Sequence, residues 1–201
     1  MSVIELIGIA GSLSLLAGWR LYACVLATGL AMRLGMLELP SHLESLDVLA
    51  SPWVIAAAAT GCIAELFADK IKWVDSVWDA INTFTRPVGG ALLALAVLDP
   101  SSTTWQIVIL LLGGSAALVS HGAKAGTRII ANASPEPVSN IVLSTIEDVV
   151  TAGGLWLILT FPAAAFAVAL LLAGLAVALI IVAAKMWRRI RPRTPTSGPK
   201  P

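Results

Sequence analysis

Four acidic residues gather in one short stretch of an otherwise apolar chain. Glu65, Asp69, Asp75 and Asp79 lie within "AELFADKIKWVDSVWD", directly after an apolar run. An ionised side chain in the hydrocarbon core of a bilayer costs about 3 kcal/mol or more, so it usually faces a charge partner or a water-filled cavity. We expect Glu65, which lies deepest, to serve a site, and Asp75 and Asp79 to occupy a solvated first turn favoured by the helix dipole.

The second half of the chain carries two polar stripes. At about 100° per residue, one face of the apolar segment 138–160 collects Asn140, Ser144, Glu147, Thr151 and Gly154. One face of the preceding apolar segment, which begins at residue 104, collects Gly114, His121, Lys124, Arg128 and Asn132. Consecutive antiparallel helices should bring the two stripes together, so that Lys124 meets Glu147 or Asp148. The alternative is that these charges only hold helices together or reach out to the membrane interface.

These patterns define a candidate substrate-binding set that mixes bases, acids and polar groups. Its members are Arg20, Glu65, Asp69, His121, Lys124, Arg128, Ser144, Glu147 and Asp148. The basic residues suit a negatively charged substrate, and Glu65 or Glu147 suits proton coupling. A lone histidine on a polar helix face is more often a hydrogen-bonding residue than a proton carrier. Cys24 and Cys62 stand apart without a metal-ligand spacing, so we expect no metal and no cofactor.

Composition assigns the class of protein that must position these residues. The 201 residues are 58% hydrophobic and only 12% charged, whereas soluble domains have about 45–50% apolar and about 25% charged residues. The chain is therefore predicted to be an all-α integral membrane protein. The net charge of +1 gives no reason to expect nucleic acid as a partner. We predict no enzyme, because the sequence lacks an HExxH, a GxSxG and a phosphate-binding loop motif.

Six apolar segments are long enough to be membrane spans, since a crossing needs about 20 residues. They are residues 3–33, 51–69, 76–98, 104–130, 138–160 and 162–186. Lys and Arg accumulate on the cytoplasmic side of membrane proteins. With Lys70, Lys72, Arg128 and the basic cluster at 185–193 on that side, the pattern predicts that both termini are cytoplasmic. The Pro-rich tail, 188–201, is predicted to be disordered.

The first and fourth of these spans share a feature. Each is longer than a crossing and carries a basic residue among small ones. The matched residues are Gly18 and Arg20 in the first span and Gly122 and Lys124 in the fourth. This pattern favours a transmembrane domain, 1–187, built from two inverted repeats, 1–99 and 100–187, the architecture that places sites at the midplane of many transporters. Chance similarity between segments rich in small residues is the alternative.

Several motifs together resemble a known family. "GWRLY", "AELFADKIKWVDSVWD", "TRPVGGA" and "HGAKAGTRIIANASPEPVSNIVLSTIED" are similar to the bacterial integral membrane family described as domain of unknown function 4126. The resemblance implies a multi-pass fold in a bacterial inner membrane and no established activity. More loosely, "ELFADK" is similar to the acidic Glu-x-Gly-Asp-Lys motif of a two-repeat cation-exchanger family, although it lacks the Gly and differs in spacing.

Three functions remain compatible with the sequence. We expect a transporter or lipid flippase for a small or lipid-linked anionic substrate, with proton coupling as an option. The alternatives are a divalent cation transporter with acidic ligands and a scaffold that transports nothing. Near-equal numbers of basic and acidic residues at membrane depth favour the first. The expected partners are the lipid bilayer and an unidentified small-molecule or lipid substrate, and a homo-oligomer is left open.

Overall fold

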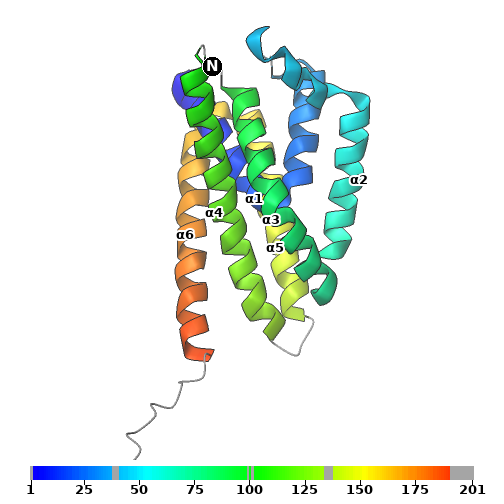
Figure 1. The fold of residues 1–201 in the computed structure, drawn as a ribbon, viewed down its shortest axis with the longest axis vertical. Helices are drawn as coiled ribbons and strands as arrows, with labels where there is room; N and C mark the ends of the chain where they lie inside the picture. The colour runs from blue at the N-terminus through cyan, green and yellow to red at the C-terminus, as the bar shows by residue number, and fades with distance from the viewer. Residues whose placement is uncertain (1, 38–40, 99, 101, 134–137, 191–201) are drawn as a thin grey trace, which may run out of the picture.

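The structure, a computed structural model, describes residues 2–37, 41–98, 100, 102–133 and 138–190. In these residues the chain forms a helical bundle (Figure 1). Its elements are α1 (Val3–Arg33), the 3₁₀ segment η1 (Ser41–Ala50), α2 (Pro52–Ala68), α3 (Lys72–Val97), α4 (Thr103–Ala133), α5 (Val138–Thr160), the 3₁₀ segment η2 (Pro162–Ala164) and α6 (Ala165–Ile190). Five helices, α1 and α3 to α6, are long and apolar enough to cross a membrane, and α2 is a shorter apolar helix. The chain is therefore an all-α, multi-pass membrane protein, as predicted.

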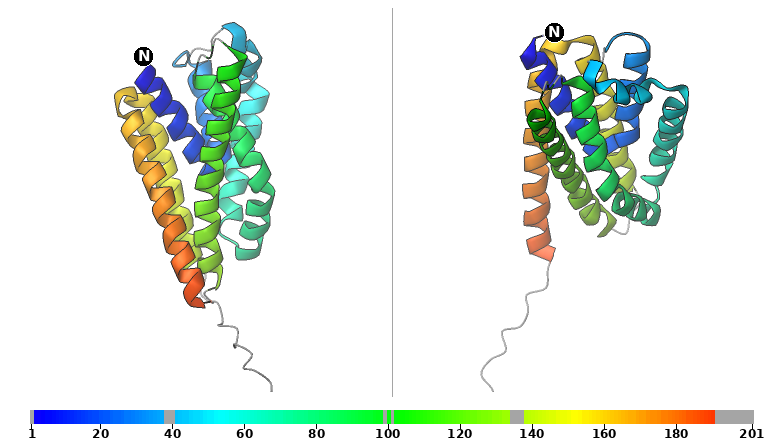
Figure 2. Two further views of the ribbon diagram at one scale, coloured as in Figure 1. Left: turned by 60° about the vertical axis from the view of Figure 1, so that its left-hand side comes forward. Right: turned by 45° about the horizontal axis from the view of Figure 1, so that its top comes forward.

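Helix α1 turns back on itself inside the bundle. Arg20 leaves the helical conformation, with φ −138° and ψ 74°. Before this break, Ser12 Oγ donates to the carbonyl of Ala165 at 3.0 Å, where α6 begins. After it, Arg33 donates to the carbonyl of Ala50 at 3.3 Å, just before α2 begins. The chain thus enters the bundle at the end where α2 and α6 start, turns at Arg20, and returns to the same end (Figure 2).

This reversal is absent from the predicted topology. The Val3 end of α1 and the Ile190 end of α6 lie at opposite ends of the bundle (Figure 1), whereas the sequence predicts that both termini lie on one side of the membrane. Of the six predicted spans, the described part of the chain has five long apolar helices, α1 and α3 to α6, and the shorter α2, and α1 turns back at Arg20. The sequence does not reveal the turn, because a long apolar segment meets the length requirement of one crossing whether it continues or turns.

The bundle is packed around α1 through residues with little or no side chain. A Cβ atom on Gly8 would lie 2.3 Å from the backbone nitrogen of Phe166, and one on Gly18 would lie 2.4 Å from the carbonyl oxygen of Ala117. Ser14 Oγ donates to the carbonyl of Gly90 at 3.0 Å. Small residues at such contacts let membrane helices approach closely and gain van der Waals energy. They hold the first half of α1 against α3, α4 and α6.

Two predictions concern the organisation of the chain, namely the start of the C-terminal tail and the division into inverted repeats. Helix α6 continues to Ile190, so the first three residues of the predicted tail are helical, and residues 191–201 lie outside the described part. Arg188 and Arg189 stand in the last turn of α6, where basic residues complement the helix dipole. The division into two inverted repeats stays a prediction, although α1 turns back at Arg20 while α4 is helical throughout.

Candidate functional site: a buried charge network

Ten ionisable side chains from α1 to α5 and the turn after α2 meet in the half of the bundle where α4 ends. We call them the charge network: Arg20, Glu65, Asp69, Asp75, Asp79, Arg86, Lys124, Arg128, Glu147 and Asp148. All except Asp148 are buried. Because burial of an isolated charge is costly, each must be compensated by its neighbours. The network holds six acids and four bases, which leaves it two negative charges in excess when all are ionised.

Asp69 is the centre of the network. Its Oδ2 atom lies 2.9 Å from Lys124 Nζ and 3.4 Å from Arg128 Nη2, and it also accepts a hydrogen bond from Arg20. Asp69 directly follows the last residue of α2, an end of a helix that disfavours an acid. Lys124, Arg20 and Arg128 come from two different helices and surround this one carboxylate. Asp69 therefore binds three cations.

Arg128 fastens α4 to three neighbouring segments. Its Nε and Nη2 atoms donate to the two carboxylate oxygens of Glu147 at 3.2 and 2.7 Å, the bidentate geometry that suits guanidinium and carboxylate groups. Its Nη1 atom donates to the backbone carbonyl of Asp69 at 3.1 Å and lies 3.4 Å from Asp75 Oδ1. One buried side chain of α4 thus contacts α3, α5 and the turn that follows α2.

Arg20 reaches the network because α1 breaks at this residue. Its Nη2 atom lies 2.6 Å from Asp148 Oδ1 and donates to Ser144 Oγ at 3.2 Å. Lys124 supports the break, since its Nζ donates to the carbonyl of Trp19 at 3.3 Å. The predicted approach of Lys124 to Glu147 is present at 3.6 Å, but Asp69 is the closer partner of Lys124.

Arg86 binds acids from two helices and fixes the state of His121. Its Nη2 atom lies 2.7 Å from Glu65 Oε1, and its Nη1 atom lies 3.0 Å from Asp79 Oδ1 and also contacts His121 Nδ1. An arginine can only donate, so His121 Nδ1 accepts. The other ring nitrogen, Nε2, then donates to Thr83 Oγ1 at 2.9 Å, because that hydroxyl itself donates to the carbonyl of Asp79. His121 is a neutral hydrogen-bonding residue here.

All nine residues predicted as a site lie in the charge network or contact it directly, and their role in binding substrate stays a prediction. The expectation of a solvated turn at Asp75 and Asp79 is wrong, because these residues are 0% and 6% exposed. Their burial follows from the basic side chains of α3 and α4 that lie against them. A signal was present in the sequence, since Asp75, Asp79, Asn82 and Arg86 recur at helical spacing on one face of α3.

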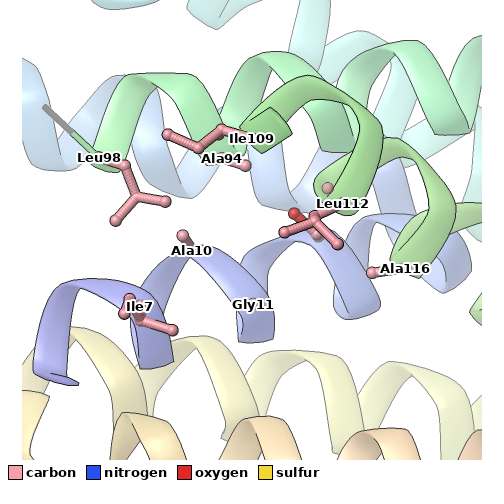
Figure 3. A pocket seen from close by; sticks show the side chains of 10 residues that line it. Ile7, Ala10, Gly11, Ala94, Leu98, Ile109, Leu112 and Ala116 are labelled. Atoms are coloured by element: carbon pink, nitrogen blue, oxygen red, sulfur yellow. The ribbon is translucent and has the colours of Figure 1, made fainter. Parts of the chain in front are cut away.

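Two cavities reach the network from different sides. A groove of about 490 Å³ between α3 and α4 is lined by Asp75, Asp79, Thr83 and Arg128, among others. A pocket of about 220 Å³ between α1, α2 and α5 reaches Arg20 and Asp148. A third cavity, also of about 220 Å³, has almost entirely apolar walls, including Ile7, Leu98 and Leu112 (Figure 3), and does not touch the network.

The acids of the network are not arranged as a metal site. Within the described ranges, no group of three or more His, Cys, Asp or Glu side chains is positioned to hold a metal ion. Asp69, Glu65 and Glu147 each lie within 3 Å of a basic side chain. A divalent cation would have to displace that base before it gained the oxygen ligands it prefers.

Comparison with known proteins gives one match. The family described as "Domain of unknown function (DUF4126)" matches residues 7–182, which include all six helices in whole or in large part and the whole charge network. No curated protein and no solved structure matches the chain. By the extent of this match, the chain belongs to the DUF4126 family.

Proposed function

We propose that the protein is a membrane transporter for an anionic substrate and that the charge network is its binding site. The observation that carries this proposal is the convergence of four buried bases on one network that reaches two cavities. A buried ion pair is weak support for stability, since apolar residues of similar volume often stabilise as well or better. Charges kept at membrane depth and facing a cavity more often serve a substrate or ion path.

Proton coupling is supported by the carboxylates that already bind the basic side chains. Arg20, Lys124 and Arg128 are each bound to carboxylates, so an anion can reach them only when a carboxylate moves away or becomes neutral. Protonation neutralises a carboxylate and frees its base. Asp75 is suited to take the first proton, because it lines the groove and neither of its carboxylate oxygens has a hydrogen-bond partner in the described part of the chain.

The distribution of basic residues supports an orientation for this transporter. Lys70, Arg188 and Arg189 lie at the end of the bundle where α2 and α6 finish. By the preference of Lys and Arg for the cytoplasmic side, that end faces the cytoplasm of a bacterial cell and both ends of α1 face outward. The groove beside Asp75, near the start of α3, then opens closer to the cytoplasm.

The excess of two acids favours a second candidate, a divalent cation transporter. It is less well supported, because the acids that would supply its ligands already bind basic side chains. A scaffold without transport is the third candidate, and it predicts that the network moves no solute at all. One flux experiment separates the three.

Proteoliposomes that contain a pH-sensitive dye provide this experiment. We expect an inward gradient of inorganic phosphate, succinate or decyl phosphate to acidify the lumen. Arg128→Met should abolish the effect, while Arg188→Met, the same change at an exposed position in the last turn of α6, should retain it. Failure of all three anions to exceed protein-free liposomes would contradict the proposal. Alkalinisation driven by Mn²⁺ instead would favour the cation transporter.

A further inference from the structure

The pocket between α1, α2 and α5 has an almost entirely apolar accessible surface, although three polar residues are among those that line it. Ala23, Cys62, Leu66 and Leu155 supply most of the apolar wall, whereas Arg20, Asp148 and Thr151 are its polar members. It lies between the long apolar helices α1 and α5 and the shorter apolar helix α2, walls that suit a ligand arriving from the lipid. A ligand that matches these walls has an apolar part and a polar end.

Arg20 and Thr151, two of these polar residues, have unused hydrogen-bonding atoms. Both residues are 2% exposed. Arg20 Nε and Thr151 Oγ1 are buried and have no hydrogen-bond partner within the described residues. A buried donor without a partner is costly, and a ligand that accepts from it removes this cost. Both atoms have almost no accessible surface while Asp148 is bound to Arg20, so a ligand would reach Arg20 Nε by displacing that carboxylate.

Asp148 occupies part of the position that an anionic ligand would take. It binds Arg20 Nη2 at 2.6 Å, next to the unused Nε atom. The Nε and Nη2 atoms together form the planar edge that binds a phosphate or carboxylate through two hydrogen bonds. Asp148 is the most exposed acid of the network, with 27% of its side chain accessible, and Lys70 lies 4.0 Å away on its exposed side. Displacement of this carboxylate costs less than displacement of any buried one.

We propose that this pocket binds an anionic amphiphile, with its phosphate or carboxylate headgroup on the Nε and Nη2 edge of Arg20 and its chain along Leu66 and Leu155. Asp148 holds the headgroup position when the ligand is absent. This inference rests on the proposed function, which it deepens by naming the substrate class and a lateral entry site. An inorganic anion lacks the apolar part that the walls of this pocket require.

Cys62 provides a direct measurement of occupancy. It lines the pocket and is partly exposed, whereas Cys24 is completely buried. The rate of alkylation by N-ethylmaleimide is measured for the purified full-length chain in phosphatidylcholine nanodiscs, with Cys62→Ala as background. We expect decyl phosphate to slow the alkylation of Cys62 about tenfold, and decanol or inorganic phosphate to slow it less than about twofold, because only decyl phosphate matches both the apolar walls and Arg20. Equal slowing by decanol, or none by decyl phosphate, would overturn the proposal.

Two substitutions test the headgroup contact. Arg20→Lys keeps the charge but removes the bidentate edge, so the concentration of decyl phosphate needed for half-protection should rise about tenfold. Asp148→Asn removes the competing carboxylate at a partly exposed position, so that concentration should fall. The second variant decides the outcome if the first does not fold, and unchanged or weaker protection in Asp148→Asn contradicts the proposal.

The flux experiment tests the transport proposal and the labelling experiment tests the amphiphile site, so one result can be negative while the other is positive. Acidification driven by phosphate without protection of Cys62 would leave the proposed transporter intact and remove the amphiphile site. Protection of Cys62 without acidification by any anion would retain the binding site and remove the transport proposal.

Discussion

Helices α1 and α4 have the same length, 31 residues, and each carries a buried basic residue among small ones, yet they have different shapes. Helix α4 runs through the bundle without a break, whereas α1 turns at Arg20 and leaves at the end where it entered (Figure 2). Length and apolar composition therefore do not determine whether such a segment crosses the membrane. The difference lies in what each helix contacts.

The turn of α1 is supported by α4. Lys124 Nζ donates to the carbonyl of Trp19, and Trp19 Nε1 donates to the carbonyl of Ser120 at 3.1 Å. Non-helical backbone at membrane depth is tolerated where protein groups satisfy its polar atoms. The continuous helix thus supplies the hydrogen-bonding groups that the broken helix needs, and the break in turn brings Arg20 to the network.

Removal of Arg128 should have the largest effect. Arg128→Met leaves Glu147 without its bidentate partner and deprives Asp69 and Asp75 of a nearby cation. Loss of one partner of a buried pair costs about 3–5 kcal/mol, so we expect a decrease of this size in the free energy of unfolding. Thermal unfolding of the purified protein measures it. The exposed control Arg188→Met should change stability by less than about 0.5 kcal/mol, and equal effects of the two variants would refute the importance of the α4 contacts.

The matched glycines of the two helices give the sharpest paired comparison. Gly18→Ala in α1 should destabilise by about 1–3 kcal/mol, because the added Cβ would meet the backbone of α4. Gly122→Ala in α4 meets nothing within 4 Å, and replacement of a helical glycine by alanine typically stabilises by about 0.5–1 kcal/mol. The same unfolding measurement applies to both. Changes of opposite sign in the free energy of unfolding would support the close approach of α1 to α4, whereas two similar changes would contradict it.

Coupling within the network should be smaller and should follow distance. Lys124 Nζ lies 2.9 Å from Asp69 and 3.6 Å from Glu147. Double-mutant cycles with Lys124→Met, Asp69→Asn and Glu147→Gln should give coupling energies above about 0.5 kcal/mol for both pairs, with the larger value for Lys124 and Asp69. Additive effects in both cycles would show that Lys124 meets neither acid.

Much of the fold could be predicted from the sequence, because hydropathy and helical spacing are local properties. The six apolar segments correspond to α1 to α6, and five of the candidate residues could be grouped because polar side chains recur on one face of α4 and of α5: His121, Lys124, Arg128, Ser144 and Glu147. These patterns require no knowledge of neighbouring helices.

The remaining features depend on contacts between distant segments. The break at Arg20 is stabilised by Lys124, more than 100 residues further along the chain, and no local pattern in α1 signals it. Asp75 has the position of a solvated first-turn acid, but Arg128 from α4 lies against it in the buried interior. Hydropathy describes each segment alone, so it detects neither effect.

Labelling from one side of the membrane tests the central claim that α1 is re-entrant while α4 crosses. In a chain without Cys24 and Cys62, single cysteines are introduced as Ser2→Cys and Met36→Cys at the two ends of α1 and Arg189→Cys near the end of α6, all at exposed positions. An impermeant maleimide added outside right-side-out vesicles should label the first two and leave the third unreacted until the vesicles are lysed. Labelling of Ser2→Cys and Met36→Cys from opposite sides would make α1 a simple crossing and contradict the account.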